Sequence, residues 1–575
     1  MKKFFHSLFS NPILLFIFSV IVLITPNLFL LFTEPLSLST RIAFILFPLG
    51  FYIIWMGTTR RIGWMGICSL PFMILGAFQL VLLYLFGNSF IAIDMFTNVV
   101  TTNAGEASEL LESIWPAIVG VCILYIPFLL WSIAGIIHKI DLKRDLRFKY
   151  LKLGAILMIL GGGAACYSSY INPLFEFNRV IFPLNVMNNI NQAIKRWHLS
   201  NDYPQRSAAF TFESKKTKKS DKREIYLFVV GETSRSANWE LAGYERETNP
   251  LLKQRNDIFF FKDGITQSNT THKSVPLILS AVNSDNYMDI YHQKSIISAF
   301  KEAGFRTLFI SNQVPNRSLI DYFSDEADQR INLSPINNDL YKENLPDGKA
   351  LQIIKDQINA DEENLFIVFH SYGSHFNYQH RYPKDMAYFK PDNANTVSTK
   401  NKDQLINAYD NSIRYVDFVL NSAIEILNDS SFSSGMFYVS DHGEDIMDDE
   451  RNKFLHASPI PTYYQLHIPV VMWFNQTYIK ENPEHFMAAR NNISKPVSTA
   501  NCFNTITDMA NIKTAYSDSS YSIVNEAFEI RNRKYVTDHN EDFYFFNMGL
   551  NDIDLKLLDD RGIYYDKSLY KKTIY

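Results

Sequence analysis

The chain has 575 residues, a formal net charge of −4 and 47% hydrophobic residues. This length exceeds that of one ordinary domain, and the slight negative charge argues against nucleic acid as a partner. The apolar residues are concentrated in the first 170 positions, which indicates two physically different halves.

The first half contains five apolar runs that are long enough to cross a membrane. A helix needs about 20 predominantly apolar residues to span the hydrocarbon core. The runs lie at residues 12–32, 42–57, 64–87, 113–137 and 149–170. A cleaved signal peptide would account for the first run alone, but no small-residue cleavage site follows it. We therefore predict a five-helix transmembrane domain over residues 1–170.

Basic residues in the short loops orient these helices. Lys and Arg cluster at residues 2–3, 60–61 and 139–149, whereas residues 88–111 contain neither. Loops rich in Lys and Arg stay on the cytoplasmic side of a membrane. Five crossings from a cytoplasmic start place everything after residue 170 outside the inner membrane.

Residues 171–224 read as a bridge between the halves. Within residues 185–199 the apolar positions recur at helical spacing, as in an amphipathic helix lying on a membrane surface. The basic run at residues 215–223 follows it. We expect this run to be a solvated linker, and the alternative is a specific contact with anionic lipid.

Cysteine usage indicates that no disulfide holds the second half together. Cys68, Cys122 and Cys166 lie in predicted spans, and only Cys502 lies beyond them. A single cysteine has no partner for a disulfide within that part. We expect Cys502 to be a buried apolar residue and the exported part to depend on its core.

Residues 225–575 show the pattern of an α/β domain. Short apolar runs alternate with helical stretches, namely IYLFVVG, RTLFIS, NLFIVFHS, GMFYVSD and IPVVMWF. Continuous apolar strands imply a largely parallel sheet covered by helices on both faces. Sites in such sheets gather at the carboxyl ends of the strands. The segments GETSR, HSYGSH and SDHGED are therefore expected at one edge.

Those strand ends carry side chains that suit a divalent metal. They are Glu232, His370, His375, Asp441, His442 and Glu444, with His456 further along the chain. Carboxylate oxygens combined with imidazole nitrogens favour zinc over calcium or magnesium. Each motif alone has a simpler explanation, since DHG is also a common turn. Three such strand ends at one edge predict a metal site.

A hydroxyl-rich segment at residues 265–276 precedes a predicted helix. Thr270 or Thr271 at the start of that helix could be ionised by the metal, while free backbone N–H groups accept a phosphoryl oxygen. The alternative is plain helix capping, which Ser and Thr perform very often. The segment alone favours capping.

The stretch VVGETSRSANWELAGYERETNP, residues 229–250, resembles the signature of the phosphoethanolamine transferases of Gram-negative inner membranes. That group includes the mobile colistin-resistance proteins and belongs to the alkaline phosphatase/sulfatase superfamily. SVP after the threonines, then GSH, YDNSIRYVD and SDHGE, occur here in the family's order. The resemblance implies a five-helix transmembrane domain followed by an exported α/β alkaline phosphatase/sulfatase-like domain, which would lie in the periplasm.

The resemblance also implies roles for individual residues. Thr271 is similar to the family's nucleophilic threonine, which also contacts the zinc. The other expected zinc ligands are Glu232, Asp441 and His442. The residues expected to contact substrate, or in the case of the histidines a second zinc, are Asn98, Thr102, Glu106, His375 and His456.

This chain departs from the family pattern beside the nucleophile. Many relatives have cysteines that flank this segment, whereas this chain has Ser268 nearby and Leu277 after the proline. His272 and Lys273 stand where relatives often have small residues. A cation there could assist a phosphate or narrow the range of acceptors.

The implied reaction is a zinc-dependent transfer with one or two zinc ions. The Thr271 hydroxyl would attack phosphatidylethanolamine, and the adduct would pass phosphoethanolamine to lipid A or another surface glycan. Added amines would weaken the binding of cationic antimicrobial peptides. The alternatives are a phosphoglycerol transferase, a plain phosphatase or sulfatase, and a non-enzymatic sensor. The sequence does not indicate an oligomeric state.

Overall fold

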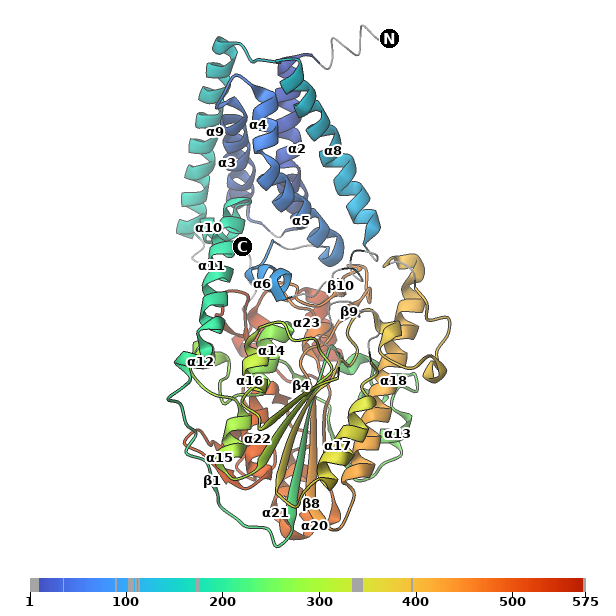
Figure 1. The fold of residues 1–575 in the computed structure, drawn as a ribbon. Helices are drawn as coiled ribbons and strands as arrows, with labels where there is room; N and C mark the ends of the chain where they lie inside the picture. Colours follow the sequence, from blue (N-terminus) through green and yellow to red (C-terminus); the bar gives the residue numbers. More distant parts are fainter. Residues whose placement is uncertain are drawn as a thin grey trace.

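A bundle of long helices stands on an α/β part, and one helix, α11, runs between them (Figure 1). The structure is a computed structural model that describes most of residues 10–571. The residues inside this range that it does not describe are 35, 88–89, 102–107, 109–110, 112–113, 172–174, 334–344 and 395–396.

The described helices of the first half provide up to five membrane crossings. They are α2 (Pro12–Thr33), α3 (Leu38–Gly57), α4 (Ile62–Cys68), α5 (Leu70–Phe86), α8 (Trp115–Ile137) and α9 (Arg144–Ile171). Four of them are long and apolar enough to cross alone, and α4 with α5, which are bent by 51° relative to each other, make a fifth if this pair is counted as one span. The third predicted span is therefore a broken helix. Pro71 lacks an N–H for the helical ladder. At the break between the two helices, Ser69 Oγ donates to Met65 O at 2.7 Å.

Glycines allow α3 and α9 to approach closely. A Cβ atom on Gly50 would lie only 2.5 Å from the carbonyl oxygen of Gly154, and one on Gly161 would lie 2.5 Å from Phe47 N. Small residues at such contacts increase the packing between membrane helices. The second span and the last one therefore form a tightly packed pair.

Several short helices connect the two halves. They are α6 (Ile93–Thr101), α10 (Phe177–Val180), α11 (Leu184–Asn201) and α12 (Tyr203–Arg206). Helix α11 forms where the sequence predicts an amphipathic helix. Its buried face includes Val186 and Asn189, whose Nδ2 donates to Ile91 O at 2.7 Å. Met187 and Ile194 on the same helix are exposed apolar residues.

The α/β part is built on a seven-stranded sheet with the order β3-β11-β8-β2-β7-β5-β6. The strands are β2 (Arg223–Gly231), β3 (Ile258–Phe261), β5 (Arg306–Ser311), β6 (Gln329–Asn332), β7 (Leu365–His370), β8 (Phe432–Ser440) and β11 (Val470–Phe474). Strands β8, β2, β7, β5 and β6 are parallel, and β11 is antiparallel to both β8 and β3. The predicted, largely parallel sheet is confirmed.

Helices cover both faces of this sheet (Figure 1). On one side lie α17 (Lys349–Asn359) and α18 (Lys402–Leu427), and on the other lie α14 (Thr271–Ile278), α15 (Ile296–Glu302), α16 (Leu319–Ser324) and α22 (Cys502–Met509). Successive residues of β2 point to opposite faces. Leu227 belongs to the apolar cluster that contains Ile413 of α18, whereas Phe228 belongs to the cluster that contains Phe300 of α15. This explains the uninterrupted apolar strand.

Smaller elements complete this part. The helices are α13 (Pro250–Lys253), α19 (Tyr463–Leu466), α20 (Gln476–Glu481), α21 (Pro483–Asn492) and α23 (Asp552–Asp560). The two-stranded pairs are β1 (Lys215–Lys216) with β13 (Ile512–Lys513), β4 (Gly264–Ile265) with β12 (Val497–Ser498), β9 (Asp445–Ile446) with β10 (Phe454–Leu455), and β14 (Lys534–Val536) with β15 (Asp542–Tyr544).

The basic run at residues 215–223 is not a free linker along its whole length. Lys216 lies in β1, and its Nζ contacts Glu224 Oε1 at 2.6 Å. The side chain of Glu224 is almost fully buried. A Lys can leave solvent when a buried carboxylate neutralises it, and the basic run itself does not show that Glu224, eight residues after Lys216, is this partner.

All four cysteines are free, and Cys502 is buried, as predicted for that residue. Cys502 is buried in the apolar cluster on the α22 side of the sheet, and burial raises the pKa of its thiol above the usual range. The other three lie in membrane helices.

Candidate active site

Two neighbouring strands bring the predicted carboxylates and histidine together. Glu232 follows β2, and Asp441 with His442 follows β8, which is the parallel neighbour of β2. All three side chains are fully buried. Their proximity follows from sheet topology, because parallel neighbours end at the same edge.

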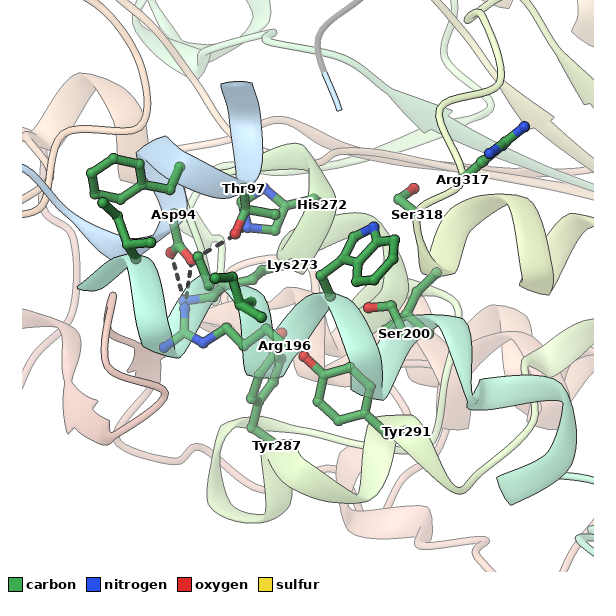
Figure 2. Close-up of a pocket in the computed structure, with 16 residues that line it drawn as sticks. Asp94, Thr97, Arg196, Ser200, His272, Lys273, Tyr287, Tyr291, Arg317 and Ser318 are labelled. Atoms are coloured by element: carbon green, nitrogen blue, oxygen red, sulfur yellow. Dashed lines mark hydrogen bonds and ion pairs between the residues drawn. The ribbon is translucent and has the colours of Figure 1, made fainter. Parts of the chain in front are cut away.

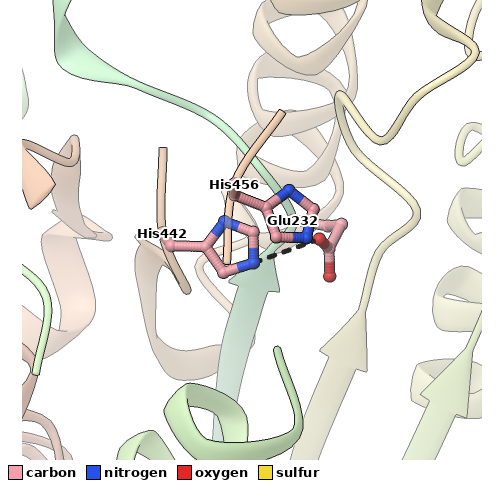
Figure 3. A group of neighbouring side chains, drawn as sticks. All are labelled: Glu232, His442 and His456. Atoms are coloured by element: carbon pink, nitrogen blue, oxygen red, sulfur yellow. Dashed lines mark ion pairs between the residues drawn. The ribbon is translucent and has the colours of Figure 1, made fainter. Parts of the chain in front are cut away.

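The polar atoms of this group converge on His442 Nε2. Asp441 Oδ2 lies 3.1 Å from it, and Glu232 Oε1 lies 3.6 Å from it. Thr271 Oγ1 lies 3.1 Å from the same nitrogen and 3.3 Å from Glu232 Oε1. Figure 3 shows His442 directed toward Glu232, with His456 beside them.

The backbone turns sharply after β2 and fixes the position of Glu232. Thr233 adopts a left-handed φ of 58°, and its N–H donates to Asp441 Oδ1 at 2.9 Å. Ser374 N donates to Glu232 O at 2.9 Å. A Cβ on Gly373 would lie 2.5 Å from that same oxygen, so only glycine fits there. Strained backbone of this kind is characteristic of functional sites.

The structure distinguishes the two candidate threonines. Thr271 is the first residue of α14, and its hydroxyl faces Glu232 and His442. The Thr270 hydroxyl lies 3.2 Å from Ser268 Oγ instead and makes no capping hydrogen bond to the helix. Ser274 Oγ, one turn into α14, donates to Asp441 O at 2.6 Å. Helix α14 is thus attached directly to the loop after β8.

The donor set fits a zinc ion. One ligand atom each from Glu232, His442 and His456 lies within 4.8 Å of the others. Asp441 Oδ2 is buried and accepts no hydrogen bond from the part of the chain that the structure describes. Buried carboxylate oxygens without hydrogen bonds are costly unless a cation compensates them. Oxygen and imidazole donors without a thiolate remain compatible with zinc.

Burial sets the protonation of this group. Loss of solvent, with Asp441 nearby, raises the pKa of Glu232 to about 7, and loss of solvent raises the pKa of Asp441 to about 7 as well. Burial, with His456 nearby, lowers the pKa of His442 to about 4. His442 is therefore neutral near pH 7, as a metal ligand must be.

The two other predicted histidines also lie beside the group. His456 Nδ1 lies 2.7 Å from Glu444 Oε2, and Tyr378 OH donates to the other oxygen of Glu444 at 2.8 Å. The ring of His375 lies 6.3 Å from that of His456. Sequence reasoning placed Glu444 at this edge but did not recognise it as the partner that orients His456.

His370 is a predicted strand-end residue that does not belong to the site. His370 is 1% exposed at the end of β7, where burial lowers its pKa to about 4, and it lies outside the group around His442.

Gln313 is a site residue that the sequence pattern did not reveal, although it lies two residues past the end of β5. Its Nε2 donates to Glu232 Oε2 at 2.9 Å. A strand-end search that includes amides would have found it.

The membrane-side substrate contacts cannot be placed. Thr102 and Glu106 lie outside the described residues. Asn98 lies in α6, but its side chain is likewise outside the described part.

Lys273 differs from the expectation that it could meet a phosphate. It is 1% exposed, and its Nζ lies 2.6 Å from Asp94 Oδ2.

The second half matches a known family. A family model described as Sulfatase covers residues 224–512, which is half of the chain. The chain belongs to the sulfatase family. The matched residues include Glu232, Thr271, Asp441, His442 and His456.

Among curated proteins, relatives in this family are phosphoethanolamine transferases. Phosphoethanolamine transferase EptA of Escherichia coli K12 is 28% identical over 391 residues, covering 65% of this chain and 69% of that protein. Kdo(2)-lipid A phosphoethanolamine 7''-transferase of the same organism is 30% identical over 270 residues, covering 46% of each. The resemblance predicted from the sequence, and with it a transferase enzyme, is confirmed.

Solved structures show the same fold. The integral membrane protein lipooligosaccharide phosphoethanolamine transferase A of Neisseria meningitidis has a TM-score of 0.68 and 22% identity, covering 88% of this chain and 97% of that one. The periplasmic domain of EptC from Escherichia coli, in complex with zinc, has a TM-score of 0.52 and 24% identity, covering 58% of this chain and 95% of that one. The predicted two-part fold is confirmed.

Proposed function

We propose that this chain transfers phosphoethanolamine from phosphatidylethanolamine to lipid A or another surface glycan at the periplasmic face of a bacterial inner membrane. The observation that carries the proposal is the position of the Thr271 hydroxyl, 3.1 Å from His442 Nε2 and 3.3 Å from Glu232 Oε1. The named relatives support the transferred group, and the name of one supports lipid A as acceptor.

The proposed metal ligands are Glu232, Thr271, Asp441 and His442. A zinc ion bound by this set would lower the pKa of the Thr271 hydroxyl and withdraw charge from the phosphoryl group. The residues fit this role because Glu232, Asp441 and His442 are fully buried donors and the half-buried Thr271 hydroxyl lies beside them. The zinc complex of a protein with the same fold supports the choice of metal.

In the first proposed step, Thr271 Oγ attacks the donor phosphorus. The bond between Oγ and phosphorus forms, and the bond from phosphorus to the diacylglycerol oxygen breaks. The hydroxyl proton passes to a base, and the departing diacylglycerol oxygen takes up a proton. Backbone N–H groups at the start of α14 face the phosphoryl oxygens favourably, because a helix N-terminus attracts anions.

In the second step, an acceptor hydroxyl or phosphate oxygen forms a bond to the same phosphorus, and the bond from phosphorus to Thr271 Oγ breaks. An acceptor hydroxyl loses its proton to a base, and Thr271 Oγ takes up a proton. His456 is proposed as a proton carrier or headgroup contact, since Glu444 holds its Nδ1 and leaves Nε2 for substrate. His375 is proposed for the same tasks. Burial, with His375 nearby, lowers the pKa of His456 to about 3, so the ring accepts a proton only transiently.

A cavity beside α14 supports a lipid donor. It has a volume of about 320 Å³, and its lining combines polar and charged residues, including His272, Lys273, Asp94 and Arg196, with apolar residues of α6, α11 and α16 (Figure 2). The apolar lining residues include Phe96, Ile190, Ile194, Trp197 and Leu319. Because membrane helices lie directly above this part, the acyl chains of a donor could remain in the bilayer (Figure 1).

The test is intact-protein mass spectrometry of the zinc-loaded chain after incubation with phosphatidylethanolamine. We expect a mass increment of one phosphoethanolamine that maps to Thr271 and is absent from Thr271→Ala. No adduct on the wild-type chain would overturn both the nucleophile and the donor. An adduct from phosphatidylglycerol instead would identify a phosphoglycerol transferase.

A further inference from the structure

A cluster of buried charges lies beside the nucleophile helix and outside the proposed metal site. Asp94 of α6 is at its centre (Figure 2). Lys273 Nζ lies 2.6 Å from Asp94 Oδ2, and Arg196 Nη1 lies 2.8 Å from Asp94 Oδ1. His272 Nε2 lies 3.4 Å from the same Oδ1 atom. Asp94 and Lys273 are 6% and 1% exposed.

This cluster joins four segments that are distant in the sequence. Asp94 belongs to α6 on the membrane side, Arg196 to the bridging helix α11, and Lys273 to α14. The turn between β14 and β15 is the fourth segment. Asp538 in that turn accepts hydrogen bonds from the backbone N–H groups of Ile93 and Asp94 at 2.9 and 2.8 Å. Its carboxylate thereby caps the start of α6.

The bridging helix and the nucleophile helix contact the same turn. Lys273 Nζ donates to Thr537 O at 2.8 Å, and Arg196 Nη2 donates to Asp538 O at 2.5 Å. Burial alone would raise the pKa of Asp94, but Lys273, His272 and Arg196 hold that pKa well below its usual range. Asp94 is thus ionised, and a buried ion that loses its partners is strongly destabilised. The contacts around Asp94 and Asp538 therefore hold these four segments together.

The position of Lys273 connects this cluster to the chemistry. It lies two residues after Thr271 on a helix of eight residues, so a shift of Lys273 shifts the proposed nucleophile. We propose that Asp94 is a positioning residue, which acts through Lys273 and Arg196 to fix the Thr271 helix at a set place relative to the membrane helices. This inference rests on the proposed function, because it concerns a donor anchored in the bilayer.

His272 and Lys273 both contact Asp94, a role that the residues around them in the sequence did not indicate. Lys273 holds the helix to Asp94, since its Nζ contacts Asp94 Oδ2 and donates to Thr537 O. A donor in the bilayer can be reached only if the helix stands at the correct place above the membrane. A donor free in solution can adjust its own position and needs no such alignment.

The experiment compares two donors in the full-length protein reconstituted in lipid nanodiscs. One is dioleoyl phosphatidylethanolamine in the bilayer, and the other is water-soluble dihexanoyl phosphatidylethanolamine. The measured quantity is the initial rate of adduct formation on Thr271. For Asp94→Asn and Lys273→Met we expect the rate with the bilayer donor to fall by about 10- to 100-fold. The rate with the soluble donor should fall by a much smaller factor.

Lys273→Met guards against misfolding, because Asp94 keeps Arg196 as a partner in that variant. The matched control is Glu224→Gln, which breaks the buried pair with Lys216 inside the α/β part. It should lower the melting temperature without changing the ratio of the two rates.

Equal losses with both donors, or no loss in either variant, would overturn the positioning role. A wild-type chain that forms no adduct with either donor would overturn the proposed function, and this inference with it.

Discussion

Thr271 Oγ1 lies 3.1 Å from His442 Nε2, although 171 positions separate these residues in the sequence. The contact exists because α14 is attached to the loop after β8 through Ser274 Oγ and the carbonyl oxygen of Asp441. A half-buried hydroxyl thus meets a buried imidazole and two buried carboxylates at the edge of the sheet.

Thr270 and Thr271 should respond differently to loss of the hydroxyl. Thr271→Ala removes the proposed nucleophile, and we expect transfer to fall by about three orders of magnitude or more. Thr270→Ala is the matched control, because that hydroxyl contacts only Ser268 among the described residues and makes no cap. Transfer assays on both variants check this, and a strong loss in Thr270→Ala would contradict the assignment.

Glu444→Gln should slow the reaction without unfolding the chain. The carboxylate of Glu444 holds His456 Nδ1 at 2.7 Å, and its loss frees the ring to rotate. Removing such a supporting partner commonly costs about 10- to 100-fold. Steady-state rates are the measurement, and Tyr378→Phe is the control with a smaller expected loss, since it leaves the bond to His456 in place. Equal activity of Glu444→Gln and wild type would refute this role.

The stability of the zinc-free chain should fall as pH rises from about 4.5 to about 7. Burial raises the pKa of Glu232 from 4.5 to about 7 and that of Asp441 from 3.8 to about 7. In this window the folded state retains protons that the unfolded state has lost, so a rise in pH favours unfolding. Zinc binds the ionised carboxylates and should reverse the trend.

Melting curves of the full-length chain with chelator and with zinc, recorded across this window, test the expectation. Other buried carboxyls, such as Glu444 and Asp445, shift in the same direction. The difference between the zinc-loaded and chelated curves therefore isolates the metal site. Stabilisation by zinc that shrinks as pH rises would count against these ligands.

Gly373→Ala should weaken both folding and zinc binding. An added Cβ would lie 2.5 Å from Glu232 O at a φ of 50°. Left-handed backbone alone costs about 1–2 kcal/mol for a residue with a side chain, and the clash adds to this. Gly243→Ala is the control, since Gly243 has a φ of 96° but open space around its Cβ. Chemical denaturation and zinc titration should show a larger effect at Gly373 than at Gly243.

Much of the fold was predictable because the residues of each strand show whether one or both of its faces are buried. The uninterrupted apolar strands predicted a covered parallel sheet, and the ends of β2 and β8 then had to place Glu232 near Asp441 and His442. The choice between Thr270 and Thr271 did not follow from the pattern alone, because it depends on the direction in which the first turn of α14 presents each hydroxyl.

The features that escaped prediction depend on partners far along the chain. Lys216 and Lys273 look like surface cations, but Lys216 Nζ donates to the carbonyl oxygen of Ala510 and Lys273 Nζ contacts Asp94. Gln313 likewise reaches Glu232 across the ends of the strands. A run of residues shows what a side chain can do, but not which distant partner is present.

The four free cysteines have a consequence for biogenesis. Folding of the α/β part passes through no thiol oxidation step, because its single cysteine is buried and lacks a partner within that part. Cellular oxidants, disulfide isomerases and external reductants should therefore leave its yield and its fold unchanged.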